Sequence, residues 1–371
     1  MFELFLPVRI LGGEGVLRKD TALRGLCGSR CLIVTDGVSA ALSGALADAE
    51  AVLDRQGIAY ISYDKIGPNP LTAACHEAGM AAKAFGAEFL LGIGGGSVLD
   101  AAKAAALYAA NPDMRPENIF ASLGGAQKPL PIALVGTTAG TGSEVTRISV
   151  LTDSRDNKKK SVADDGFYAK VVFADPSYTH SMPYAVSLST GLDALAHVLE
   201  GWLKAPMNEV GRLFGTRSIS LLWENLRTLW QSKALPDAAG RAEFYYASLY
   251  AGAVINLCGT AFCHGMGYIL TEDYDVPHGF ACAVFLPELL DRAKSFAPKK
   301  YQEIEAAFGA DLEAVTETLF EMAALPSVRM SVSQVEAYRR YWEKNPPKNF
   351  ATSPGGLTPE EAASVLKRLF T

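Results

Sequence analysis

Residues 88–110 read EFLLGIGGGSVLDAAKAAALYAA, and this stretch decides the fold. Its apolar run at residues 88–94 is typical of a buried β-strand, and the alanine-rich segment at residues 98–110 is typical of a helix. Adjacent glycines join the two. A buried strand that turns through glycines into a helix is characteristic of parallel, helix-covered sheets. The stretch therefore predicts an α/β domain.

Three more apolar runs lie on either side of this strand. They are CLIVTD at residues 31–36, IAYISYD at residues 58–64 and PIALVG at residues 131–136. Segments with helical periodicity separate them, so we expect one parallel sheet with helices packed on it. The apolar residues 1–10, MFELFLPVRI, are expected to add a first strand.

The character of the chain changes after Asp175 and Pro176. Beyond them, apolar residues recur at spacings of three and four, which is typical of amphipathic helices, and no β-rich run occurs. The sequence TPEE from Thr358 supplies an N-cap, a first-turn proline and a capping-box glutamate, so it predicts a last helix at residues 359–369.

Two domains follow from this division. We expect an α/β dinucleotide-binding domain over residues 1–180 and an all-helical domain over residues 181–371. The length of 371 residues suits two domains of ordinary size, each able to bury its own core.

The composition excludes several classes of protein. Hydrophobic residues make up 49% of the chain and charged residues 20%, with a net charge of -6, which excludes a disordered protein. The chain lacks a basic patch, so we expect neither a nucleic acid nor a membrane as partner. Residues 244–271 carry no Asp, Glu, Lys or Arg, but Asn256 and His264 within them favour a buried helix pair over a membrane span.

The cysteines indicate a reducing compartment. None of the six belongs to a CxxC pair. The amino-terminal segment contains Glu3 and lacks the basic region and cleavage site of a secretory signal. We therefore expect reduced thiols and a cytoplasmic protein.

The glycines after residues 88–94 are candidates for phosphate binding. Gly95, Gly96 and Ser97 lie between a predicted strand and a predicted helix, where backbone N–H groups can approach a pyrophosphate. A tight strand-to-helix turn is the alternative. The motif differs from the usual dinucleotide fingerprint, because it follows a later strand and lacks an acidic residue about twenty positions downstream.

Two other strand ends carry polar residues. Asp36 ends the run at residues 31–36, where a carboxylate can accept hydrogen bonds from an adenosine ribose and repel a 2'-phosphate, which favours NAD over NADP. An ordinary turn before Gly37 is the alternative. The loop GTTAGTGSEVT at residues 136–146 combines hydroxyl groups with flexible backbone, which suits contact with the phosphates or with the nicotinamide ribose.

The helical half contains a possible metal site. Asp193 and His197 are four residues apart in a predicted helix, so their side chains share one face. His264 and His278 are each followed by glycine, and two successive helix termini can bring both imidazoles to one point. A carboxylate with three imidazoles suits Fe(II), Zn(II), Co(II) or Ni(II). Histidines satisfied within an ordinary core are the alternative.

Four segments, in this order and spacing, resemble the iron-containing (group III) alcohol dehydrogenases over essentially the whole chain. They are GGGSVLDAAK at residues 94–103, GTTAGTGSEVT at residues 136–146, STGLDALAHVLEG at residues 189–201 and HGMGYILTEDYDVPHG at residues 264–279. The resemblance implies a dehydroquinate synthase-like architecture with the active site in the cleft between its two domains. It also implies hydride transfer between NAD(H) and a small primary alcohol or aldehyde, Fe(II) as the metal with Zn(II) as the alternative, and a homodimer or larger homo-oligomer.

The resemblance also assigns roles to individual residues. The metal ligands that it implies are Asp193, His197, His264 and His278. The catalytic residues expected on this basis are His264, His278 and Tyr268, the last at a position where many members carry a histidine. The cofactor contacts that it implies are Asp36, Asn69, Gly95, Gly96, Ser97, Thr137, Thr138, Thr141, Thr146 and Lys159, with Lys158 and Lys160 as alternatives to the last.

The chain departs from the family where the substrate should bind. Many members carry a histidine four residues after the third ligand, whereas this chain has Tyr268, with Glu272 and Asp273 after it. The two carboxylates suit a polyol or hydroxy-acid dehydrogenase of the same superfamily, which is the alternative function. A lyase similar to dehydroquinate synthase would need more Lys, Arg and His, and a non-catalytic NAD-binding protein would not need the metal ligands.

Overall fold

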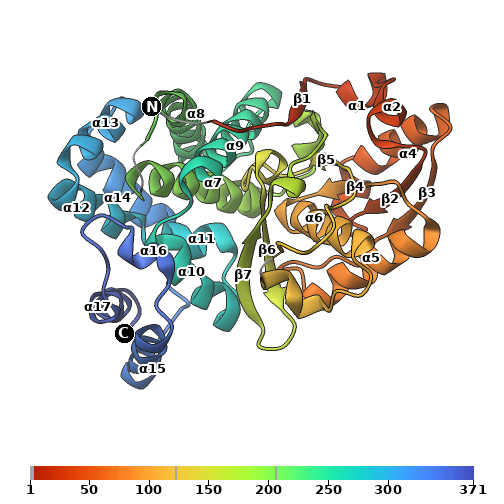
Figure 1. The fold of residues 1–371 in the computed structure, drawn as a ribbon. Coiled ribbons are helices and arrows are strands. Elements are labelled where there is room, and N and C mark those ends of the chain that lie inside the picture. The colour runs from red at the N-terminus through yellow and green to blue at the C-terminus, as the bar shows by residue number, and fades with distance from the viewer. Residues whose placement is uncertain (1–3, 122, 205–206) are drawn as a thin grey trace. The chain divides into compact units, whose positions relative to one another are not determined.

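The computed structural model of the chain describes residues 4–121, 123–204 and 207–371 (Figure 1). The chain divides into two compact units. The first unit comprises Met1–Pro183 together with Pro236–Gly252, and the second comprises Tyr184–Leu235 together with Ala253–Thr371.

A six-stranded sheet forms the centre of the first unit. Its order is β1-β8-β5-β4-β2-β3, and every neighbouring pair is parallel. The four strands predicted from apolar runs are confirmed as β2, β3, β4 and β5. The strands of the sheet are β1 Arg9–Gly12, β2 Arg30–Val34, β3 Ala59–Tyr63, β4 Phe89–Gly94, β5 Ile132–Gly136 and β8 Val171–Ala174.

Helices cover both faces of this sheet, as its continuous apolar strands require. Ile33 and Leu91 belong to one buried cluster with Leu17 of α1. Helix α6 lies on the other face, because a Cβ added at Gly92 would lie 2.8 Å from Ala102 Cβ. Helices α5 and α6 pack side by side (Figure 1). The helices before the second unit are α1 Val16–Lys19, α2 Leu23–Cys27, α3 Ser39–Leu42, α4 Ala45–Arg55, α5 Thr72–Phe85 and α6 Gly96–Ala110.

The expected first strand at residues 1–10 is wrong in its position. Strand β1 begins only at Arg9 and runs to Gly12, residues 4–8 form no strand, and residues 1–3 lie outside the described part of the chain. The physical reason is that β1 pairs with β8 alone. A ladder with four-residue β8 can hold no more than four residues of β1, whatever the hydrophobicity of the segment before it.

A two-stranded antiparallel sheet of β6 Ile148–Asp153 and β7 Lys158–Ala163 also belongs to the first unit. The sequence did not predict this hairpin, because β7 reads KKKSVA and begins with three charged residues. The ammonium group of Lys160 donates hydrogen bonds to Asp153 and Asp156, both at 2.7 Å, so the positive charge of this strand residue is paired.

The segment Pro236–Gly252 joins the first unit although it lies among the helices of the second half. Arg241 donates to the carbonyl oxygen of Thr179 at 2.7 Å, and the Tyr245 hydroxyl donates to Glu144 Oε1 at 3.1 Å. Burial raises the pKa of Glu144, and this hydrogen bond from Tyr245 partly offsets the effect. The boundary between residues 180 and 181 stays a prediction.

The second unit is helical throughout its described residues, so the predicted fold class is confirmed. Helix α17 begins with the predicted capping box, in which Thr358 and Glu361 each bind the backbone of the other. The remaining helices of the chain are α7 Tyr184–Lys204, α8 Glu209–Ser232, α9 Ala238–Cys258, α10 Phe262–Asp273, α11 His278–Ala283, α12 Leu286–Phe296, α13 Pro298–Phe308, α14 Leu312–Met322, α15 Val332–Lys344, α16 Lys348–Ala351 and α17 Pro359–Phe370.

Within the described residues, no single helix is both long enough and apolar enough to cross a membrane. The pair α9 and α10 meets the length and composition criteria only when taken together, and the two helices are bent by 112° at their junction.

Candidate functional site

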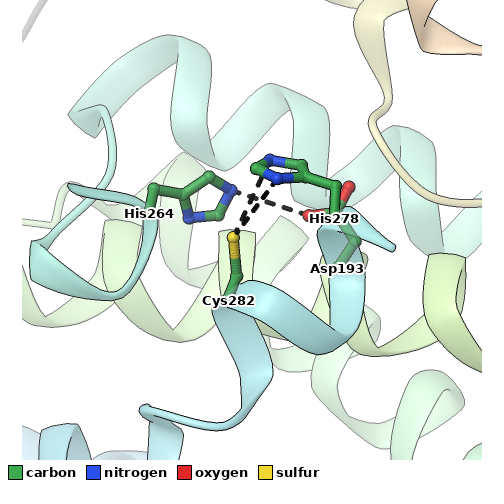
Figure 2. Close-up of side chains that lie close together, drawn as sticks. All are labelled: Asp193, His264, His278 and Cys282. Carbon is green, nitrogen blue, oxygen red and sulfur yellow. Dashed lines mark hydrogen bonds and ion pairs between the residues drawn. The ribbon is translucent and has the colours of Figure 1, made fainter. Parts of the chain in front are cut away.

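Three helices of the second unit direct potential metal ligands at one point (Figure 2). Asp193 comes from α7, His264 from α10, and His278 and Cys282 from α11. One ligand atom of each side chain lies within 4.8 Å of one ligand atom of every other. Asp193, His264 and Cys282 are buried, and His278 is partly exposed. The cluster is therefore shielded from water on most sides and open at His278.

His197, the remaining ligand implied by the family resemblance, adjoins this cluster. Its Nε2 lies 3.9 Å from Asp193 Oδ1. Its ring stacks on the ring of His264, with centroids 4.6 Å apart and planes at 22°. The structure thus brings Asp193, His264 and His278 to one point, and His197 lies beside them, one helical turn after Asp193 on α7.

Close helix packing positions His278. The next residue, Gly279, lies so near α7 that a Cβ added to it would fall 1.7 Å from the carbonyl oxygen of Ser189. Only glycine fits there without moving the backbone. Because His278 is the first residue of α11, the contact at Gly279 places its imidazole directly beside the helix that carries Asp193.

Two side chains fix the orientation of the imidazoles. Glu200 makes a short hydrogen bond to His264 Nδ1 and accepts from the His264 backbone N–H at 3.1 Å. The Thr271 hydroxyl donates to the Gly267 carbonyl oxygen at 3.2 Å, so its oxygen is available to accept from His278 Nδ1 at 3.3 Å. With the proton of each ring on Nδ1, Nε2 would keep the lone pair that a metal requires.

The centre of the cluster contains buried polar atoms that form no hydrogen bond. Asp193 Oδ1 and His264 Nε2 are 3.6 Å apart, too far for a hydrogen bond, and neither has another hydrogen-bond partner. Burial raises the pKa of Asp193, but the coulombic effect of His197 and the contacts with His264 and His278 outweigh it and keep the pKa well below its usual range. An ionised carboxylate and imidazole nitrogens that face one point fit a divalent cation.

A second arrangement lies in the first unit, where the carboxyl ends of the parallel strands meet. The chain passes from β2 outward to β3 and then returns to β4 on the other side of β2, so β2 and β4 flank a topological switch point. Ligands of open α/β sheets bind at such points. Asp36 follows β2 and Gly95 follows β4, which puts both predicted cofactor residues at this crevice.

The glycine-rich turn and the threonine-rich loop lie against one another. A Cβ added at Gly95 would lie 3.1 Å from Thr138 Cγ2, and one added at Gly96 would lie 2.4 Å from Thr141 Cγ2. The turn also begins α6 at Gly96, with Gly95 as its N-cap, which leaves the first backbone N–H groups of a long helix at the crevice.

Hydrogen bonds connect further predicted contacts to other segments of the first unit. The Thr137 hydroxyl donates to Ser39 Oγ at 3.5 Å, which links the loop after β5 to α3. Asp36 Oδ1 accepts from the backbone N–H groups of Val38 and Ser39 at 3.0 and 2.8 Å, so this carboxylate caps α3. Asn69, in the left-handed conformation with φ of 52°, accepts from Lys159 Nζ at 3.0 Å.

A buried lysine holds the loop after β5 in place. Lys103 of α6 is fully buried, and its ammonium donates to the carbonyl oxygens of Ser143 and Ile148, both at 2.7 Å, and to Thr146 Oγ1 at 3.2 Å. Burial lowers the pKa of Lys103, and nearby Asp100 partly offsets this. The predicted cofactor contact Thr146 is itself buried in this network.

Replacing Lys103 by methionine will destabilise the first unit by about 3 kcal/mol, because the change leaves several buried oxygens without their donor. The measurement is the free energy of unfolding from a urea titration. Lys83→Met, at an exposed position of α5, is the matched control and is expected to change stability by less than about 0.5 kcal/mol. Equal stabilities of the two variants would contradict the role given to Lys103.

Comparison with known proteins identifies the family. Residues 7–176 match the family described as iron-containing alcohol dehydrogenase, and residues 187–345 match the C-terminal region of the Fe-containing alcohol dehydrogenase family. The chain belongs to the iron-containing alcohol dehydrogenases. The resemblance stated from the sequence motifs is therefore confirmed.

Relatives of this iron-containing alcohol dehydrogenase cover most of its length. Lactaldehyde reductase of Escherichia coli strain K12 is 30% identical over 318 residues, which are 85% of this chain and 81% of that protein. Alcohol dehydrogenase 4 of Saccharomyces cerevisiae strain YJM789 is 31% identical over 322 residues, which are 85% of this chain and 82% of that protein. The crystal structure of an iron-containing alcohol dehydrogenase from Thermotoga maritima superimposes with a TM-score of 0.90 at 29% identity and covers 100% of this chain and 99% of that one.

These findings show the reaction class. The family's members are NAD-dependent alcohol and aldehyde oxidoreductases that use a divalent metal, and this iron-containing alcohol dehydrogenase is an oxidoreductase of that class, as predicted.

Two residues of the iron-containing alcohol dehydrogenase site were missed in the sequence. Glu200 is one turn beyond His197 on α7, and Cys282 is one turn beyond His278 on α11. Residues three or four apart share a helix face, so the spacings of three from His197 to Glu200 and of four from His278 to Cys282 could have found both.

Proposed function

We propose that this enzyme reduces a small aldehyde to a primary alcohol with NADH, at a divalent cation held by Asp193, His197, His264 and His278. The observation that carries the proposal is the pair of buried atoms, Asp193 Oδ1 and His264 Nε2, that face each other at 3.6 Å without a hydrogen bond. In a core that bound no ion, such buried polar groups would form hydrogen bonds, or apolar side chains would stand in their place.

The protein's own residues prepare the site for this chemistry. A divalent cation bound there polarises the carbonyl oxygen, and NADH supplies the hydride. Asp193 contributes the negative charge of the ligand set, while Glu200 and Thr271 hold His264 and His278 with Nε2 toward the centre. The substrate itself enters on the side of His278, the one partly exposed member of the cluster.

Tyr268 is proposed as the residue that contacts the substrate oxygen. Its ring stacks on His278, with centroids 5.8 Å apart and planes at 19°. Burial raises the pKa of Tyr268 to about 12, so the hydroxyl stays protonated at neutral pH. It can therefore donate a hydrogen bond to a carbonyl oxygen, but it does not act as a base.

The cofactor proposal rests on the crevice between β2 and β4. Gly95, Gly96, Ser97 and the loop after β5 would contact the pyrophosphate, and Asp36 would contact the adenosine ribose. Asn69 and Lys159 would contact the cofactor from the neighbouring loop and hairpin. The supporting observation is that predicted cofactor residues far apart in the sequence are hydrogen-bonded to other segments of the first unit, Thr137 to Ser39 over 98 residues and Lys159 to Asn69 over 90 residues.

The test begins with protein purified without oxygen. Its metal content is measured, and NADH and NADPH oxidation is then followed with C2 to C5 aldehydes, with diols and with hydroxy acids. The proposal predicts about one metal ion per chain and turnover of an aldehyde with NADH. Bound metal without oxidation of NADH by any aldehyde would contradict it.

The panel also decides between the proposal and a polyol or hydroxy-acid dehydrogenase. That alternative assigned hydroxyl contacts to Glu272 and Asp273. Asp273 Oδ2 already accepts from the Tyr338 hydroxyl at 2.9 Å, at the exposed end of α10. The hydrogen bond from Tyr338 of α15 thus holds the Asp273 carboxylate, which the alternative needs for substrate hydroxyls. We therefore favour a simple aldehyde as the substrate.

Removing the charge of Asp36 will weaken the preference for NADH. Asp36→Asn keeps the oxygen that caps α3 but no longer repels a 2'-phosphate, so kcat/KM for NADPH relative to NADH should rise by about tenfold or more. Asp54→Asn, an exposed residue of α4, makes the same change of net charge and is the control. A wild-type enzyme that prefers NADPH would refute the role of Asp36.

We further propose that the protein acts in the cytoplasm as a homodimer. The supporting observation is that β1 forms one edge of the six-stranded sheet, with Leu4, Phe5 and Ile10 exposed. Light scattering on the purified protein measures the mass, and a monomer at micromolar concentration would contradict the proposal.

A further inference from the structure

Tyr245 is a fully buried tyrosine of α9 that reaches the loop after β5. It belongs to the segment Pro236–Gly252, which joins the first unit although it lies in the second half of the sequence. Its hydroxyl donates to Glu144 Oε1 at 3.1 Å. Burial raises the pKa of Tyr245 well above its usual range, so the hydroxyl keeps its proton at neutral pH and remains a donor.

The backbones of α9 and of the loop are in direct contact beside this hydrogen bond. A Cβ added at Gly142 would lie 2.3 Å from the carbonyl oxygen of Ser248. A Cβ added at Gly252 would lie 2.4 Å from the carbonyl oxygen of Gly142. The loop therefore cannot move closer to α9, and the hydrogen bond from Tyr245 opposes its movement away.

The part of the loop that Tyr245 holds is the short 3₁₀ helix Ser143–Val145, with Glu144 at its middle. A single turn of 3₁₀ helix has little stability of its own, so the groups around it set its position. Lys103 holds it from α6 by donating to the carbonyl oxygen of Ser143 at 2.7 Å. Tyr245 holds it from α9.

The 3₁₀ helix is linked to a residue that faces the glycine-rich turn. The Ser143 backbone N–H donates to Thr141 Oγ1 at 3.2 Å. Thr141 in turn lies against the start of α6, because a Cβ added at Gly96 would lie 2.4 Å from its Cγ2. A displacement of Glu144 would thus reach the proposed pyrophosphate site through Ser143 and Thr141.

We propose that Tyr245 is a positioning residue for the cofactor: it holds the loop after β5 so that Thr141 and the turn at Gly96 form one binding surface. The inference rests on the proposed function, which puts the pyrophosphate of NADH at this surface. Asp36, the proposed ribose contact, is held by hydrogen bonds from Val38 and Ser39, which do not involve the 3₁₀ helix. Loss of the Tyr245 hydroxyl should therefore weaken binding of the whole dinucleotide but not binding of its adenosine end.

The test compares Tyr245→Phe with the wild type in fluorescence titrations with NADH and calorimetric titrations with AMP. We expect the Kd for NADH to rise by about tenfold, because affinity falls with the fraction of molecules whose loop stays in place. The Kd for AMP should be unchanged. Tyr246→Phe is the matched control on the next residue of α9, where the hydroxyl lies near Gly12 of β1, and it should bind both ligands as the wild type does.

Hydrogen exchange measured by mass spectrometry gives a second readout, made without any ligand. Peptides that cover residues 137–146 should exchange faster in Tyr245→Phe, and those that cover residues 31–43 should not change. Two substitutions of Glu144 test the same hydrogen bond from its other side. Glu144→Gln keeps an oxygen that can accept from Tyr245 and should bind NADH as the wild type does, whereas Glu144→Leu should reproduce Tyr245→Phe.

The outcomes separate this inference from the proposed function. An unchanged Kd for NADH in Tyr245→Phe would overturn the inference, because the hydrogen bond would then serve stability alone. An equal rise of the Kd for NADH and for AMP would overturn it as well, because the whole unit would then have loosened. Both results leave the proposed function intact. A wild type that binds neither NADH nor AMP would overturn the inference together with the proposed cofactor site.

Discussion

Asp193→Ala will lose the metal ion and essentially all turnover. A divalent cation lowers the pKa of bound water from about 16 to about 7, which corresponds to on the order of 10 kcal/mol of stabilisation for a developing charge on oxygen. Asp193 is the one carboxylate among the four proposed ligands, so its removal leaves the ion without a balancing charge. We expect kcat to fall by at least about 10⁴-fold and bound metal to fall well below one per chain.

Tyr268→Phe is the comparison for this prediction. It removes one hydroxyl next to His278 and leaves every proposed ligand in place. A positioned proton donor contributes about 10²- to 10⁴-fold to a rate. Tyr268 is proposed to donate a hydrogen bond and not to act as a base, so we expect a loss near the lower end of this range, about 10²-fold, with full metal content. A phenylalanine variant as inactive as Asp193→Ala would reverse the ranking of the two effects.

Gly96→Ala will abolish tight binding of NADH while leaving the metal site intact. The added Cβ would lie 2.4 Å from Thr141 Cγ2 and 2.7 Å from Thr141 Oγ1, so the turn and the loop must separate. The separation moves the backbone N–H groups at the start of α6 away from the pyrophosphate. We expect the Kd for NADH, measured by fluorescence titration, to rise by about 10² or more.

Gly125→Ala is the matched control for this change. A Cβ at Gly125 meets nothing within 4 Å, so affinity for NADH and stability should stay as in the wild type. Metal content is measured on both variants, because the proposed ligands all lie in the second unit and should be unaffected. An unchanged Kd for NADH in Gly96→Ala would show that the cofactor binds elsewhere.

The sequence predicted those parts of the fold that depend on local pattern. The runs that became β2, β4 and β5 are continuous apolar segments, which only a sheet buried on both faces accommodates. The TPEE sequence defined the start of α17 for a similar local reason, since its hydrogen bonds join residues three apart.

Features that depend on distant partners were not predictable in this way. The length of β1 is set by β8, more than 150 residues later. In the hairpin of β6 and β7, Asp153 of β6 stabilises the charged strand β7 by accepting from Lys160. The pattern of apolar residues within β7 does not reveal this partner. The segment Pro236–Gly252 joins the first unit through Tyr245 and its bond to Glu144, a contact that spans 101 residues.

The candidate site shows the same division. The four-residue spacing of Asp193 and His197 indicated a shared helix face, and His264 and His278 were also named from the sequence. The close approach of α11 to α7 at Gly279, which positions His278, could not be predicted. Cys282 was overlooked because a lone cysteine in a helix resembles any small buried residue until its sulfur is seen beside His278.

The most direct test of the account is anomalous diffraction from crystals of the metal-loaded protein, with data collected on both sides of the absorption edge. The proposed function predicts one ion per chain, within about 2.5 Å of Asp193, His197, His264 and His278. An ion bound elsewhere, or these four side chains without an ion in a crystal soaked in excess metal, would contradict it.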